Sequence, residues 1–160
     1  MKSAVTVENT IKEKVKRVWK LWTEPEHIKN WCNASEDWYV PNVENDLRNG
    51  GKFRTVMSAK DKSYSFDFEG VYTDVKPFQL IEYKINDGRN VKAVFIDQCD
   101  TTKVIETFEA ESINPLETQR SGWQAILDNF AMPALLTKMS ISFIFDKEKI
   151  ISFSFATSTL

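Results

Sequence analysis

Glu106 and Arg48 are the ionisable residues whose positions in the sequence suggest a role inside the protein. Glu106 alternates with Val104 and Phe108, so the three side chains are expected on one face of a strand. If that face is buried, the Glu106 carboxylate needs a cationic or hydrogen-bonding partner, or it takes up a proton. Arg48 is the first candidate for that partner, although Asp46, two residues before it, offers a local surface ion pair instead. The sequence leaves both arrangements of Arg48 open.

The other residue types that carry catalysis or bind metals are scarce. The chain has one histidine, His27, and two cysteines, Cys32 and Cys99, which are too far apart for a Cys-x-x-Cys motif. The sequence contains no Gly-rich phosphate loop, Gly-x-Ser-x-Gly elbow or His-Glu-x-x-His motif. We therefore expect two free thiols, no metal, no cofactor and no catalytic residue, and the sequence favours binding over catalysis.

Aromatic residues, in contrast, are abundant. Five Trp, eleven Phe and four Tyr make up 12% of the 160 residues, and a chain of this length is expected to form one compact domain. The formal net charge of −2, with both signs interspersed, gives no sign of a nucleic-acid-binding surface. Residues 1–8 alternate and lack a continuous apolar run, so we expect a first strand, no signal peptide and a cytoplasmic protein.

Three helices are expected to position these residues. Apolar residues recur at helical spacing from Ile11 to Trp22, which predicts an amphipathic helix. Thr23 predicts the cap of a short second helix that runs toward Trp31. A long helix is expected over Asn114–Met132, with Asn114 as its cap and an apolar face that packs on a sheet.

Between these helices the hydrophobic period changes to two, which predicts antiparallel strands. The expected strands are Trp38–Leu47, Lys52–Ser58, Ser63–Asp74, Leu80–Asn86, Val91–Gln98 and Lys103–Glu111. Their connections are short, so consecutive strands are expected to be neighbours in a meander. The predicted class is therefore α+β.

One strand of this sheet has a strongly aromatic face. Tyr64, Phe66, Phe68 and Tyr72 alternate along it, and a helix that carries Trp123 would cover that face. Each of these residues taken alone is more often plain core, but gaps at the ends of such a helix form pockets. The residues expected to line a ligand site are Trp31, Trp38, Phe66, Phe68, Tyr83 and Trp123, with Arg48 and Glu106 as polar anchors.

Several segments together resemble a known family. The segments are residues 22–31 (WTEPEHIKNW), 43–53 (VENDLRNGGKF), 68–72 (FEGVY), 106–108 (ETF) and 119–130 (QRSGWQAILDNF). They resemble the bacterial branch of the activator of heat-shock-protein-90 ATPase homologue family, which belongs to the START-related helix-grip (SRPBCC) superfamily. The resemblance implies a helix-grip fold: a curved antiparallel sheet wrapped around a long C-terminal helix, two short helices after the first strand, and an apolar cavity between them.

The resemblance leaves three functions to distinguish. The first is binding of a small hydrophobic or amphipathic ligand in the cavity. The alternatives are a chaperone-associated interaction module and an enzyme of the cyclase or hydratase kind. The helix-grip domain is expected over residues 1–132, followed by an apolar C-terminal extension over residues 133–160.

The extension after Pro133 has a different pattern. Residues 139–145 and 150–155 alternate around a charged turn, which predicts a β-hairpin and self-association through residues 139–155. The charged turn also interrupts the apolar run well short of the length of a membrane span, so no transmembrane span is expected. A helix that continues from Ala134, and an extension without function, are the alternatives.

Overall fold

The computed structural model describes residues 3–33 and 35–144, with residues 133–144 described by their backbone. Within these residues the chain forms one sheet and three helices. The elements are β1 (Ala4–Ile11), α1 (Val15–Thr23), α2 (Pro25–Trp31), β2 (Trp38–Asn45), β3 (Lys52–Ala59), β4 (Ser65–Lys76), β5 (Leu80–Ile85), β6 (Asn90–Asp97), β7 (Thr102–Glu109) and α3 (Leu116–Ile144). None of the described helices is long and apolar enough to cross a membrane.

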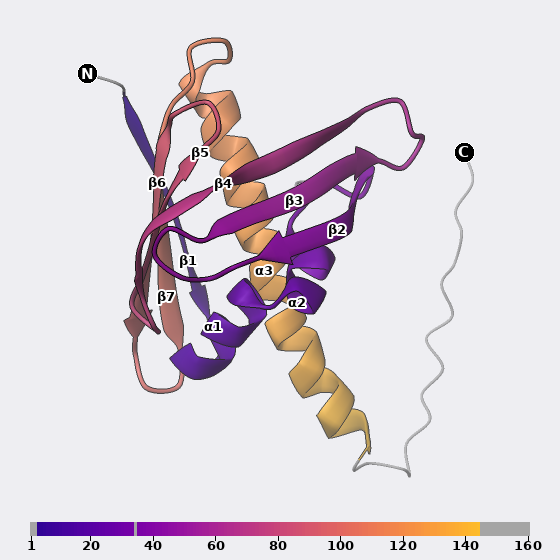
Figure 1. The fold of residues 1–160 in the computed structure, drawn as a ribbon. Coiled ribbons are helices and arrows are strands. Elements are labelled where there is room, and N and C mark those ends of the chain that lie inside the picture. Colours follow the sequence, from indigo (N-terminus) through magenta and orange to yellow (C-terminus); the bar gives the residue numbers. More distant parts are fainter. Residues whose placement is uncertain (1–2, 34, 145–160) are drawn as a thin grey trace.

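The sheet is an antiparallel meander with the N-terminal strand added at one edge. Its strand order is β1-β7-β6-β5-β4-β3-β2, so β2 to β7 each pair with their neighbours in sequence, and β1 pairs with β7. Figure 1 shows the sheet curving into a half-barrel around the long helix, with the strands β2, β3 and β4 reaching across it. The expected helix-grip fold and the expected meander are confirmed.

Alternation along β7 decides which of its side chains face inward. Thr102, Val104, Glu106 and Phe108 are buried, whereas the residues between them are partly exposed. This is the period of two that a strand imposes when one face packs on a core. Glu106 is thereby placed on the buried face of the sheet, in register with Ala93 of β6.

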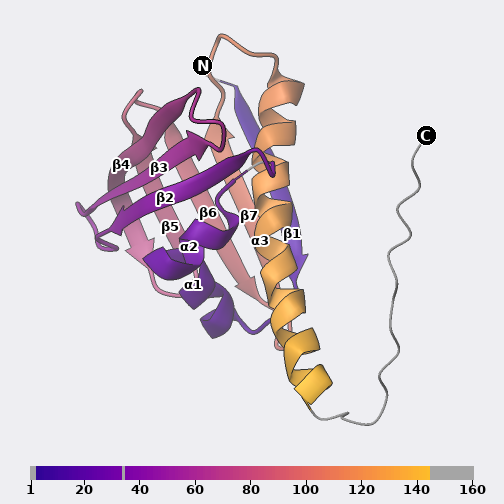
Figure 2. The same cartoon turned by 90° about the vertical axis from the view of Figure 1, so that its right-hand side faces the viewer.

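The helix α3 lies along the sheet next to β1 and β7, as Figure 2 shows. The polar side of α3 forms hydrogen bonds with the edge strand β1: the Arg120 guanidinium donates to the Thr6 carbonyl (2.8 Å), and the Gln124 amide donates to the Glu8 carbonyl (3.1 Å). On its apolar side, Leu127 and Phe130 are fully buried. These contacts fix which face of α3 looks into the half-barrel.

The helices α1 and α2 close one end of the half-barrel. The Trp31 indole N–H donates to the Leu21 carbonyl (3.0 Å), and the Asn45 amide of β2 donates to the Thr23 carbonyl (2.6 Å). The Thr23 hydroxyl donates back to the Trp19 carbonyl at 2.8 Å, so the predicted role of Thr23 as the cap of α2 is wrong. The hydroxyl is satisfied within α1 instead, a bond that threonine commonly makes in helices.

The ends of α3 also differ from the prediction. The Asn114 side chain donates to the Glu111 carboxylate (2.7 Å) and does not cap α3, which begins at Leu116. At the other end the helix continues through Pro133 to Ile144, beyond the edge of the sheet (Figure 1). The first predicted strand of the C-terminal hairpin is therefore helical as far as Ile144, and the remainder, residues 145–155, lies outside the described residues. A proline removes one helical hydrogen bond, but the helix formers that follow resume the ladder.

Candidate ligand-binding site

A cavity of about 300 Å³ lies between the concave face of the sheet and the helices α2 and α3. Its walls come from α1, α2, β3, β4, β5, β7 and α3, so both layers of the fold contribute to it. Phe66 is 40% exposed and stands at the mouth, whereas Ile81 and Tyr83 are buried at the inner wall. The predicted site residues that line the cavity are Trp31, Phe66, Phe68, Tyr83, Glu106 and Trp123.

Aromatic rings that support one another form most of the wall. Trp123 of α3 stacks on Phe108 of β7, with ring centroids 4.2 Å apart and planes at 13°. Across the cavity Phe53 meets Tyr83 edge-on at 5.0 Å, and Phe68 lies 6.2 Å from Trp123. Such paired rings have few alternative rotamers once packed, so the wall keeps its shape when the cavity is empty.

Gly70 lets the strands under this wall approach closely. A Cβ at Gly70 would lie 2.3 Å from the Lys84 carbonyl oxygen and 2.9 Å from the Phe53 ring. Because there is no side chain at this position, the Phe53 ring can pack directly against β4. The glycine is thus part of the architecture that sets the floor of the cavity.

Glu106 is the buried carboxylate of the cavity. It is only 5% exposed, and no hydrogen bond or ion pair joins it to any other described residue. Among the described side chains, no fully enclosed oxygen or nitrogen is without a partner, so the Glu106 oxygens must touch the open space of the cavity. Burial raises the pKa of Glu106 to about 8, because its charged form has lost water and gained no counter-charge.

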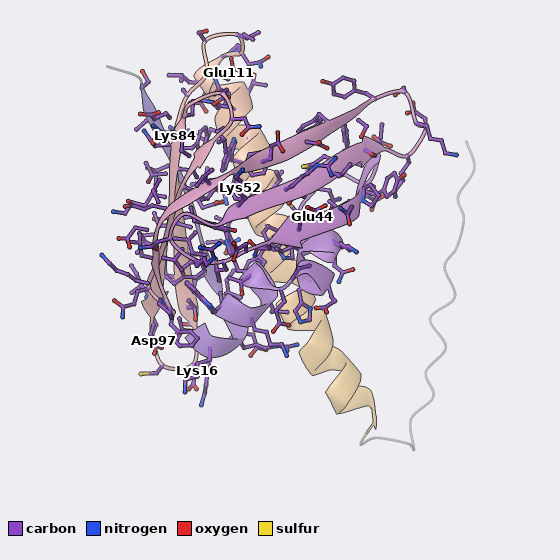
Figure 3. The ribbon with its side chains drawn as sticks, viewed as in Figure 1. Lys16, Glu44, Lys52, Lys84, Asp97 and Glu111 are labelled. Carbon is purple, nitrogen blue, oxygen red and sulfur yellow. The ribbon has the colours of Figure 1, made fainter. Side chains whose placement is uncertain are left out.

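Many carboxylates and amines among the described residues are, in contrast, exposed to solvent. Lys16, Glu44, Lys52, Lys84 and Asp97 are exposed and project from the surface, as Figure 3 shows. Beside Glu106, Ala93 is fully buried and contributes only a methyl group across the strand pair.

Several other polar groups line the cavity with Glu106, among them Cys32, Thr55 and Tyr83. Burial, and to a smaller extent the nearby Glu106 charge, raise the pKa of the Cys32 thiol to about 12. The pKa of Tyr83 is raised well above its ordinary value, first by burial and then by the charges of Glu106, Tyr72 and Cys32. Both groups therefore stay protonated at neutral pH and serve as hydrogen-bonding groups, since a thiol without its charge is a poor nucleophile.

Two predicted site residues lie elsewhere. Arg48 is exposed and pairs with Asp46 at 2.9 Å, so the proposed Arg48–Glu106 pair is wrong and the local surface pair is what forms. Trp38 does not line the cavity. Its ring packs on Tyr64 (6.2 Å) and Phe66 (5.7 Å) in an aromatic cluster just outside the mouth.

Cys32, Thr55 and Arg89 also line the cavity, and the sequence-based set did not include them. Thr55 could have been found, because it alternates with the apolar Phe53 and Met57 on one strand face. Cys32 and Arg89 follow the ends of α2 and β5, and no periodic pattern fixes the direction of such residues. Their positions depend on how α2 and the β5–β6 turn pack on the sheet.

Metal-ion chemistry finds no support in the described residues, which contain no group of three His, Cys, Asp or Glu side chains able to hold a metal. His27 lies away from the cavity, where its ring contacts Glu24 at 3.5 Å. The site is thus a mostly apolar pocket with one carboxylate at its inner wall.

A curved antiparallel sheet wrapped around a long helix, with an aromatic cavity between them, defines a helix-grip protein of the START-related type. The family model for "Activator of Hsp90 ATPase homolog 1-like protein" matches residues 12–132. The chain belongs to this family, as the resemblance of its sequence motifs implied.

Solved structures agree with that assignment. The chain is 48% identical to the Chr148 protein of Cytophaga hutchinsonii, with a TM-score of 0.72 over 90% of this chain and 96% of that one. It is 33% identical to an AHSA1-like protein of Aeromonas hydrophila, with a TM-score of 0.77 over 94% and 100% of the two chains. The NE0264 protein of Nitrosomonas europaea shares the fold at 17% identity, with a TM-score of 0.71 over 86% and 96% of the chains. Comparison with curated proteins gives no match.

Proposed function

We propose that this protein binds a small, largely apolar molecule with one polar end in the cavity between α3 and the sheet. The observation that carries the proposal is the unpartnered Glu106 carboxylate facing a 300 Å³ cavity whose other walls are mostly apolar. A core that served stability alone would gain by filling this space and removing the charge. A pocket with a few polar groups among apolar walls is the usual form of a small-molecule site.

The distribution of polarity orients the ligand. Glu106, Cys32 and Tyr83 influence one another electrostatically, so they belong to one polar region of the cavity. Phe66 and the aromatic cluster outside the mouth form the apolar approach. The ligand therefore enters with its polar end first and leaves its apolar body against Phe68 and Trp123.

Binding explains the site better than catalysis does. Acid–base catalysis usually needs a second group that changes protonation near neutral pH. The titratable groups that share the cavity with Glu106 are Cys32, Tyr72, Tyr83 and Arg89. Burial raises the pKa of the first three, and Arg89 is held by Asp87 at 2.7 Å, so none of the four supplies that second group.

A cavity-filling variant tests the proposal. Protein freed of bound small molecules by refolding is titrated calorimetrically with indole, tryptophol, tryptamine, octanol and decanoate. Thr55→Phe places a ring in the cavity and is expected to weaken any binding at least about tenfold, because a packed cavity resists extra volume. Val56→Phe, on the other face of the same strand, is the matched control and should bind as the wild type does. Binding by no probe, or binding that Thr55→Phe leaves unchanged, would refute the proposal.

The family name supports a second candidate, a chaperone-associated interaction module. In that case the protein would raise the ATPase rate of a heat-shock-protein-90 chaperone through its surface. The test is the ATPase rate of such a chaperone with and without this protein. An increase that Thr55→Phe leaves intact would favour the second candidate, since that substitution changes the interior alone.

A further inference from the structure

The cavity has an acidic inner wall with no counter-ion. Among the described side chains that line it, Arg89 is the only cation. Its guanidinium is held by the Asp87 carboxylate through two contacts of 2.7 Å and donates to the Glu109 carbonyl at 3.3 Å. Burial alone accounts for the raised pKa of Glu106, so the charge of Arg89 has no effect on that pKa. A proton therefore neutralises Glu106 in the empty cavity at neutral pH, and a positive charge beside its carboxylate would have to come from a ligand or from residues outside the described part of the chain.

Aromatic faces surround the place where that charge would sit. Glu106 and Phe108 are two residues apart on one face of β7, which separates them by roughly 7 Å. Trp123 covers Phe108 in a parallel stack at 4.2 Å, and Tyr83 is close enough for the Glu106 charge to affect its ionisation. The faces of Trp and Tyr rings attract cations, most strongly where water is excluded.

We propose that the ligand of this cavity is an organic cation, a protonated amine on a small apolar body, with its ammonium group on the Glu106 carboxylate. This inference rests on the proposed function and specifies its ligand class. An ammonium group supplies both the hydrogen-bond donors and the charge that the carboxylate lacks. A carboxylate ligand would place two like charges together in a dry site, and a neutral alcohol would supply one donor without the charge.

The size of the cavity limits the apolar body. An apolar cavity of about 150 Å³ holds a benzene molecule, so 300 Å³ accommodates about a dozen non-hydrogen atoms. Tryptamine has that size. Tryptophol and indole-3-acetate carry the same ring with an alcohol or a carboxylate in place of the amine. The three probes therefore differ mainly in the charge that they bring to Glu106.

Protonation gives a second signature. Because burial raises the Glu106 pKa to about 8, the empty site is mostly protonated at pH 7, and a bound ammonium must displace that proton. Tryptamine affinity is then expected to rise about tenfold from pH 7 to pH 9 and to level off, as the amine itself stays protonated over most of that range. The facing groups Cys32, Tyr72 and Tyr83 have raised pKa values and Arg89 is ion-paired, so they do not titrate in this window. The elements α1, β3 and α3 present only uncharged side chains to the cavity.

The experiment is calorimetric titration of the full chain with the three probes at pH 7 and pH 8.5. Wild-type protein at pH 8.5 is expected to bind tryptamine at least about tenfold more tightly than tryptophol, and indole-3-acetate most weakly. At pH 7, repeating the titration in buffers of different ionisation enthalpy should show close to one proton released by tryptamine and almost none by tryptophol. Glu106→Gln should lose the preference for the amine and the proton release while it still binds tryptophol. Glu8→Gln, which removes an exposed carboxylate paired with Lys103, is the control and should keep the wild-type order.

The outcomes separate the two proposals. Saturable binding of tryptophol or indole that Thr55→Phe weakens, with no preference for tryptamine or a preference that survives Glu106→Gln, overturns the cation inference and leaves the proposed function standing. Binding of none of the probes by the wild type overturns both. Preference for tryptamine that disappears in Glu106→Gln, together with proton release, supports both.

Discussion

The Glu106→Gln substitution should stabilise the ligand-free protein by an amount that grows with pH. In the folded protein the Glu106 pKa is raised to about 8, against an ordinary value of 4.5. Between these two values the folded state holds a proton that the unfolded state has released, so the free energy of unfolding falls as pH rises. The gap corresponds to about 5 kcal/mol in total, at about 1.4 kcal/mol per pH unit. Gln has nearly the same volume and no charge, so the variant lacks this loss.

The assay is urea unfolding of wild type and variant at pH 5, 6.5 and 8, followed by tryptophan fluorescence. Most of the effect falls in this range, so the difference in unfolding free energy should increase by about 3 to 4 kcal/mol from pH 5 to pH 8. A constant difference in packing between Gln and protonated Glu cancels from this comparison. Glu8→Gln, which loses an exposed ion pair with Lys103, should differ from wild type by less than about 1 kcal/mol throughout. Parallel profiles for wild type and Glu106→Gln would refute the reasoning, because they would mean that Glu106 faces water or a counter-charge.

Three further substitutions or modifications test the surroundings of the site. Gly70→Ala should destabilise the protein by about 2 kcal/mol or more in urea unfolding, because the Cβ of the new alanine would lie 2.3 Å from the Lys84 carbonyl oxygen. Unchanged stability would contradict the close approach of β4 and β5 at this position. A thiol reagent at pH 8 should label the exposed Cys99 rapidly and the half-buried Cys32, whose pKa is raised to about 12, at least about a hundredfold more slowly, as mass spectrometry of peptides would show. Equal rates would mean that the cavity admits water freely. Asn45→Ala should lower the free energy of unfolding by about 1 to 3 kcal/mol, since the Asn45 side chain donates to the Thr23 carbonyl of α1 and accepts from the Tyr72 hydroxyl of β4, each at 2.6 Å. A loss below about 0.5 kcal/mol would show that these hydrogen bonds contribute little to stability.

Periodicity was enough to predict most of the strands and helices, whereas the helix-grip arrangement was implied by the family resemblance. The strands alternate because one face of each packs on the core, and this pattern is local in sequence, so β3 and β7 lie where the alternation placed them. Helix boundaries were less predictable. Thr23 had two acceptable hydrogen-bonding arrangements, and the one inside α1 formed. Pro133 was expected to end α3, but the residues after it favour helix and the helix continues.

The site was predictable where it depends on strand alternation and unpredictable where it depends on packing. Glu106 and Phe68 face the cavity because their strand positions leave no other choice. Arg48 was the first candidate partner for Glu106 because buried charges need partners, with an Asp46 pair as the alternative; Asp46 is nearer in sequence, and the surface pair is the one that forms. The direction of Cys32 follows from the docking of α2 on the sheet, which no local pattern encodes.

The most direct test of the central claim is the carbon-13 titration of the Glu106 side-chain carboxyl by NMR, with and without a saturating ligand. In the ligand-free protein the midpoint should lie near pH 8, because the carboxyl faces a cavity that lacks both bulk water and a counter-charge. Saturation with tryptamine should lower the midpoint by about two pH units or more, since a buried ammonium favours the carboxylate. A midpoint near 4.5 in the ligand-free protein, unchanged by any probe that fits the cavity, would contradict the claim that Glu106 lines a ligand site.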